Sequence, residues 1–207
     1  NVSHCERLGV IEKIDSKIYQ MTPLGIKLKN NQIDLFQLFR NQMLLFSFDT
    51  GKGKLYPYRE AFKFMRQVRE LGFVDFVYGI YSLQVDDAGV TLLQDAVDTA
   101  KKIQLAFPNI EITSEANKES VLEQLNGMHP SGFPYNDVWT DRTTTGNQFR
   151  YLIRHLELFD ELFEFKNKRL YLKAGAEDLL DKYLDTTQPM LSHGYGAHWW
   201  IDARIKK

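Results

Sequence analysis

The stretch that decides the predicted fold is residues 143–173, TTTGNQFRYLIRHLELFDELFEFKNKRLYLK. In its first half, apolar side chains recur at positions i, i+3, i+4 and i+7, namely Phe149, Leu152, Ile153 and Leu156. This spacing predicts an amphipathic helix with one buried face. From Phe163 the apolar period changes to two around a basic tip, residues 166–169 (KNKR), which predicts a tight hairpin. A polar helix face followed at once by a basic hairpin is typical of the recognition helix and wing of a winged helix-turn-helix.

A similar unit occurs near the start of the chain, in LGVIEKIDSKIYQMTPLGIKL (residues 8–28). Strands are expected from Val10 to Ile14 and from Ile18 to Met21, with a charged turn between them. Thr22 and Pro23 are the residue types of an N-cap and a first helical position. The order strand, turn, strand and helix thus occurs twice, which predicts two tandem winged helix-turn-helix subdomains. Because hairpins followed by helices are common, chance similarity is the alternative.

The expected fold class is mostly α with small β-hairpins (α+β). Residues 1–50 are expected to form the C-terminal part of a first winged-helix subdomain, 51–185 a second one with extra helices, and 186–207 a linker towards a missing domain. Helices are expected at 23–29, 33–46, 57–71, 73–83, from Asp86 or Asp87 (the N-cap) to 104, 121–125, 143–156 and after 174. The first subdomain lacks its leading helices, so we expect the chain to be part of a longer protein.

Composition narrows the class of protein. With 207 residues, 43% of them hydrophobic, the chain can form one or two domains with real cores. The formal net charge of −1 argues against bulk binding of nucleic acid, so any DNA contact needs a local basic surface. Cys5 is the single cysteine, and the sequence contains neither a signal peptide nor an apolar run of membrane-spanning length. We therefore expect a cytoplasmic protein with no membrane partner.

The order of these segments resembles a known family. TPLGIKL, YPYREAFKFMRQVRELG, VDFVYGIYSL and TTTGNQFRYLIRHLELF, followed by the basic hairpin, resemble the DNA-recognition region of AlwI-like type IIS restriction and nicking endonucleases over residues 8–185. The resemblance implies two winged-helix subdomains that bind a short asymmetric site on double-stranded DNA. It also implies a separate nuclease domain or subunit with a Mg²⁺-dependent PD-(D/E)xK site. No Pro-Asp pair occurs in this chain, so we expect neither catalytic residues nor a cofactor here.

The expected DNA contacts fall into two groups. Polar side chains on the outer face of the helix are expected to reach base edges, since arginine pairs with guanine and asparagine with adenine: Asn147, Arg150, Tyr151 and Arg154. Gln148 of the same helix is also expected to bind DNA. Phosphate contacts are expected at the helix start and at both hairpins: Thr143, Thr144, Thr145, Lys166, Lys168, Arg169, Lys13 and Lys17. A solvated helix face with a threonine N-cap cluster is the structural alternative.

Other motifs favour no catalytic or metal site. His193 and His198 lack nearby cysteine or a suitable acid, so a linker is the simpler interpretation than zinc. The loop at 49–54 lacks the spacing of a phosphate-binding loop. Two alternative functions stay open, a winged-helix transcription regulator and a winged helix that binds protein. A regulator is expected to dimerise on a palindrome, and an interaction module to show no salt-dependent affinity for DNA.

Overall fold

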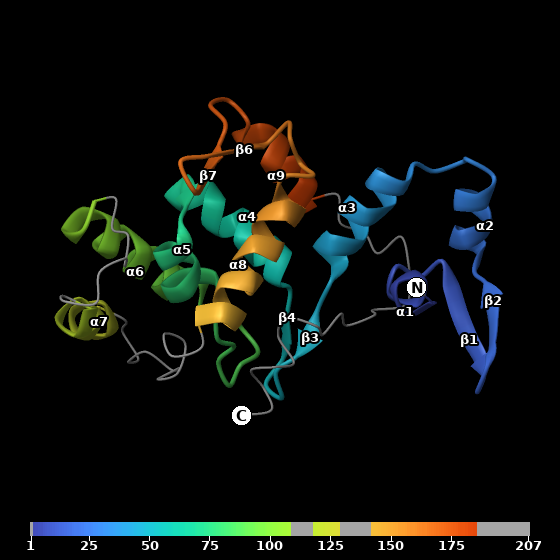
Figure 1. The fold of residues 1–207 in the computed structure, drawn as a ribbon, viewed down its shortest axis with the longest axis horizontal. Coiled ribbons are helices and arrows are strands. Elements are labelled where there is room, and N and C mark those ends of the chain that lie inside the picture. The colour runs from blue at the N-terminus through green and yellow to red at the C-terminus, as the bar shows by residue number, and fades with distance from the viewer. Residues whose placement is uncertain (1, 109–117, 129–141, 186–207) are drawn as a thin grey trace.

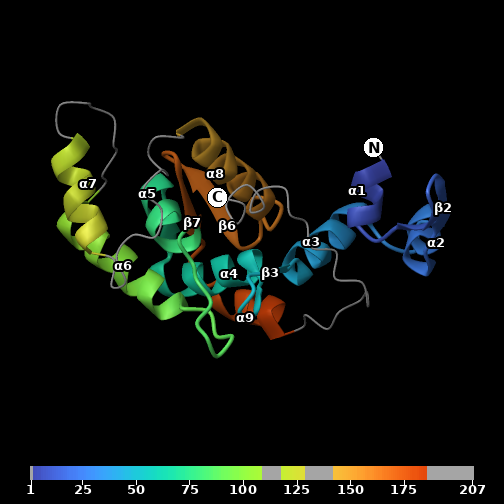
Figure 2. The same cartoon turned by 90° about the horizontal axis from the view of Figure 1, so that it is seen from below.

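The computed structural model of the chain describes residues 2–108, 118–128 and 142–185. Helices dominate this part, together with three small antiparallel sheets, so the coarse fold class is confirmed. A small N-terminal lobe comprises α1 (Val2–Arg7), β1 (Ile11–Asp15), β2 (Ile18–Met21) and α2 (Pro23–Lys29). Helix α3 (Leu35–Leu45) joins this lobe to the main body, and the lobe lies at the opposite end of the long axis from α7 (Lys118–Gly127) (Figures 1 and 2).

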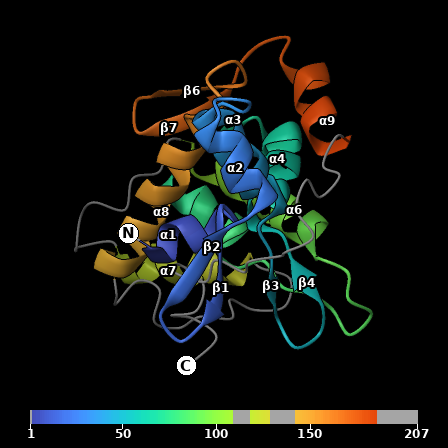
Figure 3. The same cartoon turned by 90° about the vertical axis from the view of Figure 1, so that its right-hand side faces the viewer.

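The main body contains the remaining elements. They are β3 (Phe48–Asp49), β4 (Lys54–Leu55), α4 (Pro57–Val68), β5 (Glu70–Leu71), α5 (Phe73–Asp75), the π-helix η1 (Phe76–Ile80), α6 (Leu93–Ala106), α7, α8 (Arg142–Leu156), β6 (Phe163–Lys166), β7 (Arg169–Leu172) and α9 (Glu177–Asp185). The β1–β2 and β3–β4 hairpins project towards the same side of the molecule (Figures 1 and 3).

Both predicted hairpins are confirmed. In the first, Ile11 pairs with Met21 and Lys13 with Tyr19. Thr22 then caps α2, because its Oγ1 accepts a hydrogen bond from Gly25 N at 3.1 Å and donates one to Gly9 O at 2.6 Å. Gly25 lies against the start of the hairpin, since a Cβ there would meet Val10 O at 2.0 Å.

The second hairpin belongs to a three-stranded sheet of order β5-β7-β6. Its turn residues Asn167 and Lys168 both have positive φ, 49° and 61°, which is the geometry of a two-residue type I′ turn. The returning strand β7 also pairs with β5, so that Leu170 lies opposite Leu71. Residues directly after α4 therefore hold the hairpin in place beside α8.

The buried apolar residues form two clusters. The small one, in the N-terminal lobe, contains Val10, Leu24 and Leu38. The large one fills the main body and includes Phe62, Phe64, Tyr78, Val97, Leu152, Leu156 and Leu170. Helix α3 contributes Leu38 to the small cluster and Met43 and Leu44 to the large one, so a single helix spans both cores.

Three predicted boundaries are wrong. The helix predicted over 57–71 ends at Val68, and Glu70 and Leu71 form the strand β5 instead. The helix predicted over 73–83 is one short turn followed by a π-helix, in which Gly79 lies so close to Phe64 that a Cβ would meet its ring at 2.7 Å. The long helix begins at Leu93 rather than at Asp86 or Asp87. Asp86 Oδ1 instead accepts hydrogen bonds from Ala88 N and Val90 N at 2.9 and 2.8 Å, and so stabilises a turn.

Some expectations concern other parts of the chain. The linker at 186–207, with His193 and His198, and most of the loop expected at 126–136 lie outside the described residues. Among the described helices, none is both long and apolar enough to cross a membrane.

Candidate nucleic-acid interface

Helix α8 has one apolar and one polar face, as its sequence predicts. Phe149, Leu152, Ile153 and Leu156 are all buried in the main core. Phe149 also packs against the rings of Phe73 and Phe76, with centroids 5.7 and 5.4 Å away. Asn147, Arg150, Tyr151 and Arg154 are exposed on the opposite face. Their backbone is therefore fixed by the core while their side chains reach solvent, an arrangement that suits recognition of a partner.

Gln148 does not belong to this outer face. Only 7% of its surface is exposed, and its Oε1 has no hydrogen-bond partner among the described residues. Position 148 precedes Leu152 by four residues, so the helical repeat turns it towards the core. We therefore remove Gln148 from the expected DNA contacts.

Thr143, Thr144 and Thr145 lie in the first turn of α8, one to three residues after its first residue, Arg142. They thus occupy the end of the helix where backbone N–H groups point outward and can bind an anion. Their side chains lie outside what the structure describes. The expected phosphate contact at this site stays a prediction.

His155 anchors the C-terminal end of α8. Its Nδ1 lies 2.6 Å from the hydroxyl of Tyr58 on α4, and its ring packs edge-on against Phe39 of α3 at 5.6 Å. Burial lowers the pKa of His155 to about 4 and raises the pKa of Tyr58 well above its usual range. Tyr58 therefore keeps its proton and the imidazole stays neutral, so one hydrogen bond joins the Tyr58 hydroxyl to Nδ1 and helps to fix α8 in the body.

The β6–β7 hairpin presents two exposed lysines. Lys166 forms an ion pair with Glu164 at 3.0 Å and lies 5.2 Å from the centre of the Tyr171 ring. Lys168 occupies the tip of the hairpin, in the left-handed turn. Both lysines are exposed beside α8, where a ligand of Lys166 would compete with the Glu164 carboxylate.

Arg169 faces inward instead. Its side chain is 14% exposed, and Nη2 binds both Glu70 Oε1 at 3.1 Å and the carboxylate of Asp75. Burial raises the pKa of Asp75, while Arg169 and a 2.8 Å hydrogen bond from Gly72 N oppose that rise. Because β7 pairs with β5, this arginine satisfies a buried carboxylate and is withdrawn from the expected phosphate contacts.

Lys13 and Lys17 are exposed in the first hairpin, on β1 and in its turn. The hairpin lies at the far end of the molecule from α6 and α7, and α8 lies between them (Figures 1 and 2). The two sets of expected contacts are thus on separate parts of the molecule that α3 connects.

Several cations have structural roles that the sequence did not reveal. On α4, Arg66 Nε binds Asp181 at 3.1 Å and Arg59 donates to Leu184 O at 2.9 Å, and just after the helix Arg69 pairs with Glu177. These three arginines hold α9 against α4.

The described residues also bear on metal and phosphate binding. Within the described ranges, no group of three or more histidine, cysteine or acidic residues could hold a metal ion. The loop at 49–54 bonds to itself, with Thr50 Oγ1 donating to Gly53 O at 2.9 Å, and Gly53 packs against Gly89. It does not form a cradle for phosphate.

Comparison with protein-family models and with curated proteins finds no match to this chain. What the chain does must therefore be inferred from the arrangement of its own residues.

Proposed function

We propose that the chain binds double-stranded DNA at a short asymmetric site, with α8 in the major groove and the β6–β7 hairpin along the backbone. The observation that carries this proposal is the division of α8 into a buried apolar face and an exposed face with Asn147, Arg150 and Arg154. A basic hairpin follows this helix at once and is fixed beside it by β5. The order of α8, β6 and β7 is that of a recognition helix and wing.

The spacing of the exposed residues suits contact with base edges. Arg150 and Arg154 are four residues apart on one face, which corresponds to about 6 Å of helix rise, close to two base-pair steps of about 3.4 Å each. Each guanidinium can form two hydrogen bonds with a guanine, and the Asn147 amide can do so with an adenine. Neighbouring bases in one groove are thus within reach of one helix face.

The electrostatics favour few phosphate contacts. With Arg169 bound to Asp75 and Glu70, the expected cations are Lys13, Lys17, Lys166 and Lys168. Four such contacts predict that the logarithm of the binding constant falls with the logarithm of salt concentration at a slope of about 3–4. This moderate value agrees with the net charge of −1.

We further propose that this DNA-binding unit directs an AlwI-like type IIS restriction or nicking endonuclease. The support is the sequence resemblance over residues 8–185. The proposal assigns cleavage to a separate nuclease domain or subunit. The chain by itself is then expected to bind DNA as a monomer and to leave it uncut in Mg²⁺.

Selection from a pool of randomised duplexes tests the proposal. The unchanged chain should select one asymmetric sequence, and Arg150→Ala or Arg154→Ala should relax the preference at one base pair each, at a cost of about 1–3 kcal/mol. Lys101→Ala, which removes an exposed cation on α6, serves as the matched control and should leave the preference unchanged.

The alternatives give different results in the same assay. A palindromic site bound by a dimer would point to a transcription regulator, and no salt-dependent binding to any duplex would point to a protein-interaction module. If both arginine variants kept the parental preference at every position, α8 would not be the reading helix.

A further inference from the structure

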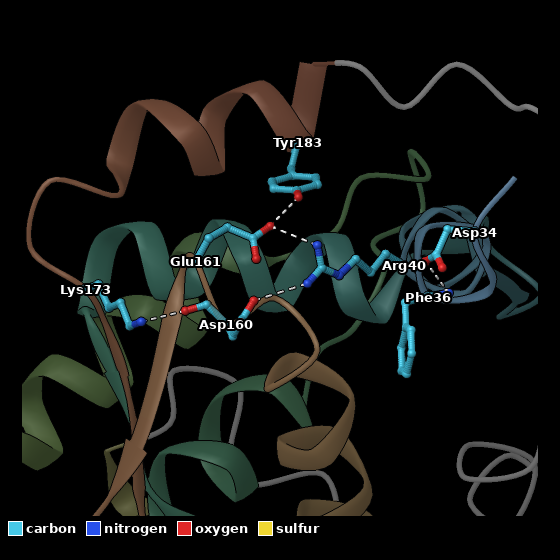
Figure 4. A network of polar contacts seen from close by, with 7 residues as sticks. All are labelled: Asp34, Phe36, Arg40, Asp160, Glu161, Lys173 and Tyr183. Atoms are coloured by element: carbon cyan, nitrogen blue, oxygen red, sulfur yellow. Dashed lines mark hydrogen bonds and ion pairs between the residues drawn. The ribbon is translucent and has the colours of Figure 1, made fainter.

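A polar network joins α3 to the segment between α8 and β6. Arg40 of α3 binds Glu161 Oε1 through Nη1 at 3.2 Å and Asp160 Oδ1 through Nη2 at 3.3 Å (Figure 4). Its guanidinium carbon also lies 5.4 Å from the centre of the Phe159 ring. One side chain thus contacts three consecutive residues of the turn that connects the proposed reading helix to its hairpin.

Other elements brace the same turn. The hydroxyl of Tyr183 on α9 donates to Glu161 Oε1, and Lys173 Nζ, just after β7, donates to Asp160 O at 2.6 Å (Figure 4). Phe39, the neighbour of Arg40, packs against His155 near the end of α8. The end of α8 and the turn that follows it therefore contact the middle of α3, and Lys173 after β7 binds the same turn.

The other half of α3 belongs to the N-terminal lobe, since Leu38 is buried with Val10 and Leu24. An α-helix is stiff over its length, so a restraint at Arg40 is transmitted to the β1–β2 hairpin. Without this contact, α3 could pivot on its apolar packing against the main body.

We infer that Arg40 is a positioning residue, which holds the β1–β2 hairpin in a fixed orientation to α8 and the β6–β7 hairpin so that both hairpins contact one DNA duplex. The fixed orientation of the N-terminal lobe to the main body, called the joint below, follows from the contacts of Arg40. That both hairpins bind the same DNA duplex rests on the proposed function. Lys13 and Lys17 then bind phosphates at a set distance from the bases read by α8.

Distance measurement between two spin labels tests the joint without DNA. The labels are placed on exposed residues of α2 and α6, in the full chain with Cys5→Ser, Lys27→Cys and Lys101→Cys. We expect one narrow distance distribution, which Arg40→Ala broadens. Arg66→Ala, which removes an arginine-carboxylate contact within the main body, is the matched control and should keep it narrow.

A second variant guards against misfolding of Arg40→Ala. Asp160→Asn combined with Glu161→Gln keeps the shape of the turn and removes both charges opposite Arg40, and it should broaden the distribution as well. A broad distance distribution in the labelled protein that retains Arg40 would refute the positioning role of Arg40. An equally narrow distribution in all the variants would refute it as well.

The salt dependence of DNA binding tests whether both hairpins contact the same DNA duplex. Lys13→Ala with Lys17→Ala should lower the salt slope by about two when Arg40 is present, since two phosphate contacts are lost, and by much less in the Arg40→Ala background. An equal loss in both backgrounds would refute the coupling between the hairpins. If the unchanged chain bound no DNA, the proposed function would fall, while the label distances would still decide the joint.

Discussion

At the scale of single residues, His155 links the proposed reading helix to the core, and its protonation should control stability. Burial lowers its pKa from 6.5 to about 4 in the folded chain. Above pH 6.5 the imidazole is neutral in both states, so its contribution is fully present. Between pH 6.5 and 4 the unfolded chain binds a proton that the folded chain does not. The free energy of unfolding therefore falls as the pH is lowered, by about 3 kcal/mol at most.

Denaturant titrations between pH 7 and 5 measure this effect. The fall attributable to His155 should approach a slope of about 1.4 kcal/mol per pH unit below pH 6. His155→Gln retains a hydrogen-bonding group opposite the Tyr58 hydroxyl but cannot titrate, so the stability of this variant should vary less over this range. Parallel curves for the two proteins would show that His155 has no such role.

The orientation of individual side chains at the candidate interface could be predicted only in part from the sequence. The helical repeat predicts correctly that Arg150, Tyr151 and Arg154 face outward. Gln148 and Arg169 were chosen for their chemistry, and each faces inward. Arg169 binds Asp75 across 94 positions of sequence, a pairing that depends on where β5 meets β7. Local pattern cannot show this.

At the scale of elements, α8 and the two hairpins were predictable because local residues determine them. The apolar repeat sets the helix, Thr22 and Pro23 set the start of α2, and residues 166–169 form the basic tip of a tight turn. The π-helix η1 was not predictable, since the close approach of Gly79 to Phe64 is a tertiary contact. Asp86 was misassigned because an aspartate can cap a helix or close a turn equally well.

The turn of the second hairpin allows its shape to be separated from its charge. Lys168 has φ of 61°, a conformation that glycine adopts without strain. Lys168→Gly should therefore leave the unfolding free energy unchanged or raise it by up to about 1 kcal/mol, because relief of strain is partly offset by entropy of the unfolded chain. The same change should lower the salt slope of DNA binding by about one.

Lys168→Ala is the matched comparison for this turn. It also removes the charge but keeps the strained backbone, so it should weaken DNA binding equally without any gain in stability. If Lys168→Gly and Lys168→Ala both bound DNA with the parental salt slope, the tip of the hairpin would lie outside the interface.

At the scale of the whole molecule, two cores of very different size share α3. Sequence periodicity marks apolar faces but does not say which faces meet, so it could not show that Leu38 and Met43 belong to different clusters. Nor could it show the contact of Arg40 with Glu161, which are 121 residues apart. The predicted order of elements survives at this scale, whereas their relative positions required the structure.

The unequal cores predict unequal local stability. The β1–β2 hairpin is largely exposed, and the apolar cluster of the N-terminal lobe has three buried residues among those described, whereas Ala61, Phe62 and Met65 of α4 are fully buried. Amide hydrogen exchange should therefore be faster in residues 2–29 than in α4.

The variant Leu24→Ala tests this difference. It should lower the free energy of unfolding of the N-terminal lobe by about 2–5 kcal/mol, remove protection from residues 2–29 and leave α4 protected. Leu71→Ala, an equal truncation in the large core, should instead lower protection throughout the main body. Mass spectrometry of exchanged peptides distinguishes the two patterns, and loss of protection in both parts with either variant would mean that the chain unfolds as a single unit.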